Sequence, residues 1–177
     1  MKAQNPMPTA VVLANIVTFQ AGWLACVLGA ARGWTWQGPL VVAAIAGLWL
    51  LHSRRRRNLA LLLALCGSVG LCWDSWLAVL GLIGYAPGPL SPPLAPVWIF
   101  ALWVLFATTL HTSLRWLQRN LWLASVLGAI AAPVSYFGGA RLGALSLLQP
   151  QAALWAQAAG WALLLPALLT LARRLDV

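Results

Sequence analysis

The sequence predicts an all-α membrane protein: a six-helix transmembrane bundle that forms a single domain over residues 1–177, with both termini in the cytoplasm. Three observations support this prediction. The chain is 62% hydrophobic and only 7% charged, whereas a water-soluble domain carries about 25% charged residues. Several apolar runs reach the roughly 20 residues that cross a hydrocarbon core. The basic residues gather at alternate ends of those runs.

Proline marks the boundaries and bends of the expected spans. Pro39 and Pro96 lie near the starts of the second and fourth spans, where the first helical turn accepts proline. The proline-rich segment 85–93 cannot be helical and closes the third span. Pro133 and Pro166 are expected to bend the fifth and sixth spans. The predicted spans cover approximately residues 9–31, 36–53, 59–84, 94–117, 121–137 and 152–171.

The distribution of basic residues sets the predicted orientation. Cytoplasmic loops of membrane proteins carry the excess of lysine and arginine. With the N-terminus inside, the outer loops hold only Arg32 and Arg141, and nine basic residues fall on the cytoplasmic side. These nine are Lys2, Arg54, Arg55, Arg56, Arg57, Arg115, Arg119, Arg173 and Arg174. The positive net charge is thus explained by topology, and no soluble basic module for nucleic acid is present.

The cysteines and the missing motifs argue against a metal or cofactor site. Cys26, Cys66 and Cys72 all lie in apolar segments, and their odd number and spacing do not fit a disulfide framework or a zinc site. The sequence contains no His-x-x-x-His pair, no paired carboxylates, no Ser-His-Asp set and no phosphate-binding glycine loop. We therefore expect no metal and no cofactor.

Asp74 is the only acidic residue before Asp176, and it falls in the outer half of the third predicted span. Small residues share its helical face, so we expect it to face protein. Burying it costs at least about 2.5–3.5 kcal/mol unless it is paired or hydrogen-bonded. We predict an ion pair with Arg141, with Arg32 as second choice, and a hydrogen bond from Tyr136. Such a pair is either a proton or substrate site near the outer surface or a lock between helices.

A polar stripe ends the fourth predicted span. Its members fall within about 100° of one another on a helix, and Asn15 of the first span lies at the same depth. A polar slot with a cationic mouth suits an anionic headgroup or an acyl carboxylate. The alternative is that the threonines bond to their own helix and the arginines reach to phosphates without specificity. The predicted binding residues are Asn15, Thr108, His111, Thr112, Arg115 and Arg119.

The chain resembles an uncharacterised family of small bacterial inner-membrane proteins, catalogued only as a domain of unknown function. The resemblance rests on the stretch from Pro96 through Trp98 and Trp103 to Trp116, and on the segment from Pro133 to Gly143; Asn15 and Asp74 occupy matching places. It covers nearly the whole chain and implies a six-span protein of the bacterial inner (plasma) membrane. An association with genes for cyclopropane-type fatty-acid modification is also implied.

These observations favour a protein that binds membrane lipids, anionic headgroups among them, as an accessory to membrane lipid or fatty-acid modification. One alternative is a small proton-coupled transporter that uses Asp74 and Arg141. Another is an intramembrane enzyme with His111 as general base, since histidine titrates near neutral pH. Whether the protein is an enzyme stays open on the sequence, and its protein partners are unknown.

Overall fold

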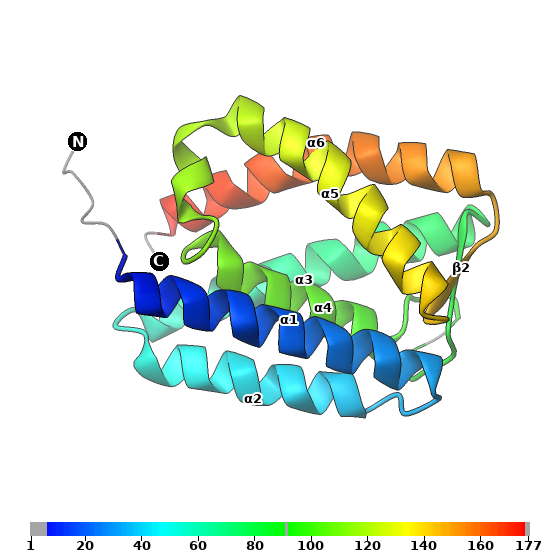
Figure 1. The fold of residues 1–177 in the computed structure, drawn as a ribbon, viewed down its shortest axis with the longest axis horizontal. Coiled ribbons are helices and arrows are strands. Elements are labelled where there is room, and N and C mark those ends of the chain that lie inside the picture. The colour runs from blue at the N-terminus through cyan, green and yellow to red at the C-terminus, as the bar shows by residue number, and fades with distance from the viewer. Residues whose placement is uncertain (1–6, 91, 176–177) are drawn as a thin grey trace.

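The computed structural model describes residues 7–90 and 92–175, where six α-helices run between the same two ends of a bundle (Figure 1). Lys2 and Asp176 lie outside the described residues. A 3₁₀ helix, η1, and two short strands complete the fold. The elements are α1 (Thr9–Ala31), α2 (Gln37–His52), α3 (Arg56–Val79), β1 (Ile83–Tyr85), α4 (Val97–Leu110), η1 (Arg115–Arg119), α5 (Leu121–Arg141), β2 (Leu145–Leu147) and α6 (Pro150–Arg174).

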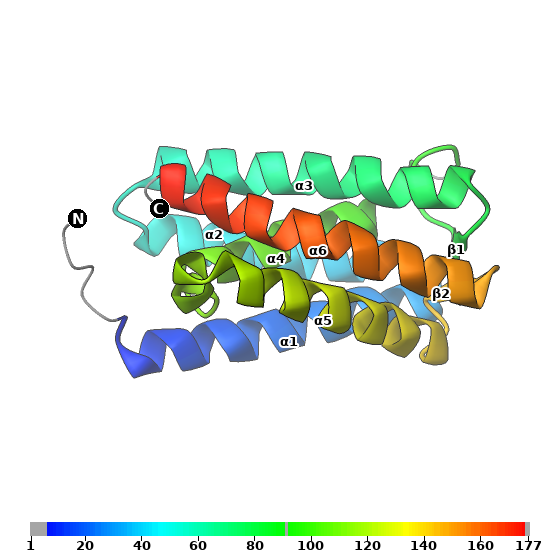
Figure 2. The same cartoon turned by 90° about the horizontal axis from the view of Figure 1, so that it is seen from above.

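The helices pack in pairs around α4. Helix α1 packs along α2, α3 along α4, and α5 along α6. Helix α4 also contacts α1 and α2, so it lies inside the bundle, whereas α5 and α6 form a separate pair on one side (Figures 1 and 2). Gly38 permits the close approach of α1 and α2, because a Cβ on it would lie 2.4 Å from the Cα of Cys26.

Four helices, α1, α3, α5 and α6, are long and apolar enough to cross a membrane. Helices α2 and α4 are equally apolar but shorter; the 14 residues of α4 extend about 21 Å. The outer surface of the bundle is apolar as well, since Leu163, Trp122 and Val79 are 75%, 75% and 69% exposed. Large apolar side chains exposed over so much of a bundle indicate a surface that contacts lipid rather than water.

Helix α4 ends at Leu110, well before the predicted end of the fourth span at residue 117. The last carbonyl groups of any helix lack partners within it, and here side chains supply them. The Thr108 carbonyl accepts from Asn15 Nδ2 at 3.3 Å and from Thr112 Oγ1 at 3.0 Å, and the Leu110 carbonyl accepts from Gln118 Nε2 at 2.9 Å. Polar side chains therefore stop the helix where composition alone would continue it.

Helices α3 and α5 each end in a turn that contains a glycine. Gly81 and Gly143 have positive φ values of 65° and 85°. The Gly81 amide bonds to the Ala78 carbonyl and the next amide bonds to Leu77, and the Gly143 turn repeats this pattern. This arrangement is a Schellman motif, which glycine favours because it has no Cβ. The prediction that the third span runs to residue 84 is therefore wrong.

Strands β1 and β2 follow these two turns and pair antiparallel, with Gly84 opposite Ser146. They join the α3–α4 connection to the α5–α6 connection at one end of the bundle (Figure 1). The apolar sequence of segment 142–149 fits either an interfacial position or one that dips into the membrane; in the structure this segment contains β2. The strand pair positions Tyr85 so that its hydroxyl group reaches Asp74 of α3.

Candidate functional site: a buried carboxylate beside an apolar groove

Asp74 is completely buried and accepts hydrogen bonds from three aromatic side chains. Its Oδ1 atom accepts from the hydroxyl groups of Tyr85, at 2.5 Å, and of Tyr136. Its Oδ2 atom accepts from Trp103 Nε1 at 2.6 Å. The four residues come from α3, β1, α4 and α5, so one carboxyl group connects four elements of the fold.

Local packing positions two of the three donors. Gly70 lies one helical turn before Asp74, and a Cβ there would lie 1.9 Å from the Trp103 ring. The absence of a side chain at Gly70 thus lets the indole lie against α3 and reach the carboxylate. Tyr85 is held by β1 and contacts the ring of Trp98 edge-on, with centroids 5.9 Å apart.

The arrangement suits an ionised carboxylate. An indole N–H only donates, and an ionised carboxylate only accepts. Burial, together with the nearby Asp74 carboxylate, raises the pKa of Tyr85 well above its ordinary value, so this hydroxyl keeps its proton at neutral pH. Hydrogen bonds to a charged group contribute about 1.5–3 kcal/mol each, so three of them offset the burial cost of about 2.5–3.5 kcal/mol.

The predicted ion pair between Asp74 and Arg141 is wrong. Arg141 is exposed, and its guanidinium carbon lies 5.1 Å from the centre of the Phe137 ring. The guanidinium carbon of Arg32, the second choice, lies 5.7 Å from the centre of the Trp34 ring. Three neutral donors already hold the carboxylate, which lets both guanidinium groups stay at the surface of the bundle. The expected hydrogen bond from Tyr136 is present.

Sequence reasoning missed Tyr85 and Trp103 as partners of Asp74. One signal was available for Tyr85: the chain contains only two tyrosines, and both donate to its only acidic side chain within a predicted span. Trp103 gave no comparable signal, because it is one of twelve tryptophans and its role depends on the space left by Gly70.

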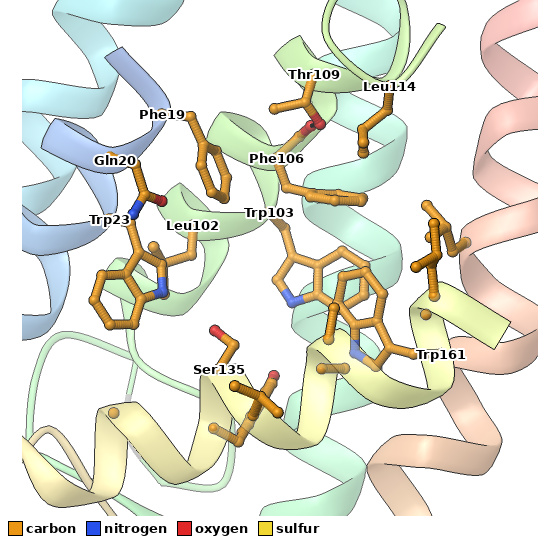
Figure 3. A pocket seen from close by; sticks show the side chains of 18 of the residues that line it. Phe19, Gln20, Trp23, Leu102, Trp103, Phe106, Thr109, Leu114, Ser135 and Trp161 are labelled. Atoms are coloured by element: carbon orange, nitrogen blue, oxygen red, sulfur yellow. Dashed lines mark hydrogen bonds between the residues drawn. The ribbon is translucent and has the colours of Figure 1, made fainter. Parts of the chain in front are cut away.

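A groove of about 750 Å³ lies beside this cluster, between α1 and α4 on one side and α5 and α6 on the other (Figure 3). Aromatic rings form much of its wall: Trp103 stacks on Trp161 with centroids 4.6 Å apart, and Phe106 packs edge-on against Trp161 at 5.1 Å. Trp23 faces them from α1 (Figure 3). Trp103 and Tyr136 line the groove and also donate to Asp74.

The groove carries few polar atoms. They include the side chains of Gln20, Thr109 and Ser135 (Figure 3). Ser113 also lines the groove. The indole nitrogen of Trp161 is buried without a hydrogen-bond partner in the described structure. A concave, mainly apolar surface with a few polar groups is typical of sites for small apolar ligands.

The predicted polar slot around Asn15 is closed by its own hydrogen bonds. Asn15 is fully buried; its Nδ2 donates to Thr108 Oγ1 at 3.3 Å as well as to the Thr108 carbonyl, and its Oδ1 accepts from Ser113 Oγ at 2.7 Å. Thr112 donates to the same carbonyl at 3.0 Å. The structure therefore brings Asn15, Thr108 and Thr112 together as a clasp between α1 and the end of α4.

The other predicted members lie beyond the end of α4. His111 is buried, contacts the Trp49 ring edge-on at 6.5 Å, and lines a smaller pocket with His52. Arg115 is half-buried and Arg119 is exposed, both on η1. The predicted polar stripe does not form one helical face, because α4 ends at Leu110. The stripe residues are Thr108, His111, Thr112, Arg115 and Arg119.

Among the described residues, no group of histidine, cysteine or acidic side chains could hold a metal ion. The apolar helices, the lipid-compatible surface and the buried carboxylate beside a groove define a helical membrane protein. The chain belongs to the family described as Protein of unknown function (DUF2878), which it matches over residues 12–167. No match was found among curated proteins or among solved structures. Membership in an uncharacterised family agrees with the resemblance inferred from sequence, but it assigns no activity.

Proposed function

We propose that this protein crosses a bacterial plasma membrane six times, with both termini in the cytoplasm. All six helices run between the same two ends of the bundle (Figure 1). The run Arg54–Arg57, the arginines of η1 and the last turn of α6 lie at one end, whereas Arg32 and Arg141 follow helices that end at the other. The positive-inside rule then places the arginine-rich end in the cytoplasm.

We further propose that the groove binds the acyl chain of a membrane lipid, and that the protein acts as an accessory to membrane lipid or fatty-acid modification. The observation that carries the proposal is the groove of about 750 Å³ with its almost wholly apolar lining. It extends to Ser113 and Trp116, next to Arg115 and Arg119. Arginine side chains at that end are suited to an anionic headgroup.

The alternatives have less support. A transporter that couples Asp74 to Arg141 would need a contact that the described structure replaces with Tyr85, Trp103 and Tyr136. An enzyme that uses His111 would need that side chain in the groove, whereas His111 lines the smaller pocket beside α2.

A phospholipid with a photoreactive acyl chain tests the groove. We expect irradiation to label its walls, and Ala131→Trp, which adds a bulky ring to an exposed groove residue, to reduce labelling about tenfold, equivalent to about 1.4 kcal/mol. Ile130→Trp is the matched control, because Ile130 is 59% exposed and does not line the groove. The readout is mass spectrometry of labelled peptides. Equal labelling of both variants would contradict the proposal.

Native mass spectrometry tests whether the arginines of η1 bind an anionic headgroup. The double variant Arg115→Gln with Arg119→Gln should retain less anionic lipid than the unaltered protein and the same amount of zwitterionic lipid.

Lipid profiling of a deletion strain tests the accessory role. An unchanged profile of modified fatty acids would contradict that role, while the proposal that the groove binds an acyl chain would stand.

A further inference from the structure

We propose that the part of the groove formed by Trp103, Tyr136 and Trp161 is a binding site for hydrophobic organic cations, such as quaternary ammonium or phosphonium compounds. The inference depends on the groove of the proposed function but not on its occupation by lipid. It assigns to Asp74 a role in selecting the charge of a ligand that the carboxylate does not touch.

Asp74 accepts hydrogen bonds from neutral groups. The three groups that bond to it are two hydroxyls and one indole N–H, all of which are neutral. They stabilise the negative charge without cancelling it. The arginines at the same end, Arg32 and Arg141, lie over aromatic rings at the surface. An ionised Asp74 places a negative charge in an apolar interior, where electrostatic interactions are much stronger than in water.

The Asp74 carboxylate lies directly behind the wall of the groove. Trp103 and Tyr136 each donate a hydrogen bond to Asp74 and each line the groove. A ligand in contact with either side chain is thus separated from the carboxylate by a single aromatic residue. The field of the carboxylate at this wall attracts a cation and repels an anion.

The groove wall beside Asp74 is largely aromatic. The electron-rich face of an aromatic ring attracts cations, and tryptophan is the strongest of the three aromatic residues in this respect. Trp103 and Trp161 are stacked, Phe106 packs against both, and Trp23 stands across the groove (Figure 3). None of the described lining residues carries a charge, although the chain as a whole has a net charge of +9. Nothing in the lining therefore repels a cation.

Two probes of nearly equal shape and opposite charge provide the test. Tetraphenylphosphonium and tetraphenylborate are added to the full chain in nanodiscs of zwitterionic lipid, and binding is measured by equilibrium dialysis against empty nanodiscs. We expect saturable binding of the phosphonium, at least about tenfold tighter than any binding of the borate. If the two ions bind alike, or only as much as to empty nanodiscs, the inference is wrong. This comparison uses the unaltered protein and so does not depend on the folding of a variant.

Asp74→Asn then isolates the carboxylate. Asparagine can accept the Trp103 hydrogen bond through its oxygen and donate to the tyrosine oxygens through its amide nitrogen. We expect this variant to bind tetraphenylphosphonium about tenfold more weakly. Arg141→Gln is the control for a change of one charge outside the groove and should not weaken binding. Undiminished binding by Asp74→Asn would overturn the role of Asp74. If lipid still photolabels the groove but phosphonium does not bind, this inference is wrong and the proposed function stands.

Discussion

Replacing Asp74 by leucine is expected to destabilise the protein by about 3 kcal/mol or more, the largest effect of any single substitution considered. Leucine has a similar size but accepts no hydrogen bond, so Tyr85, Tyr136 and Trp103 would each lose their partner. A buried donor left without an acceptor costs about 1–3 kcal/mol. The free energy of unfolding can be measured in detergent by titration with a denaturing surfactant, followed by circular dichroism.

Asp74→Asn is the matched comparison for this experiment. It keeps one acceptor for Trp103 and offers two N–H groups to the tyrosine oxygens, so we expect a smaller loss of stability than for Asp74→Leu. If leucine is tolerated as well as asparagine, the hydrogen bonds at Asp74 do not hold the bundle together. The comparison is informative because, in some proteins, replacing buried charged groups by apolar ones increases the free energy of unfolding.

Gly70→Ala is expected to destabilise the protein by about 1–3 kcal/mol, which is the usual cost of overpacking a well-filled interior. The added methyl group would lie 1.9 Å from the Trp103 ring, so one of the two must move. Trp103 cannot shift freely, because it bonds to Asp74 and stacks on Trp161. Thermal unfolding in detergent gives the measurement.

Gly47→Ala serves as the control for Gly70→Ala. Gly47 lies in the interior of α2, and a Cβ there would meet nothing within 4 Å. Alanine favours a helix over glycine by about 0.5–1 kcal/mol, so this variant should be neutral or slightly more stable. A loss of stability at Gly47 equal to that at Gly70 would show that helix flexibility, rather than contact with Trp103, explains both.

Much of the helical architecture could be predicted from the sequence, because long apolar runs and prolines determine where helices lie. The predicted first span, residues 9–31, has the bounds of α1. The end of α4 could not be predicted in this way. It depends on hydrogen bonds from Asn15 and Gln118. Asn15 is distant from the end of α4 in sequence, and Gln118 follows it after a turn. Helical periodicity carries no information about such contacts.

The site was predicted in part. Asp74 stood out because a carboxylate within an apolar run requires partners, and Tyr136 was among those named. Charge alone suggested Arg141, but the partners that reach Asp74 are neutral, and a tertiary contact across Gly70 brings Trp103 to it. The groove had no sequence signal, since most of its lining residues are ordinary apolar and aromatic side chains, drawn mainly from four helices.

The most direct test of the central claim, that aromatic donors hold an ionised carboxylate inside the bundle, is an infrared difference spectrum between the unaltered protein and Asp74→Asn at neutral pH. The chain has only two acidic side chains, so the difference isolates one carboxyl group. We expect the substitution to remove the stretching bands of an ionised carboxylate. Removal of a protonated-carboxyl band instead would contradict the account.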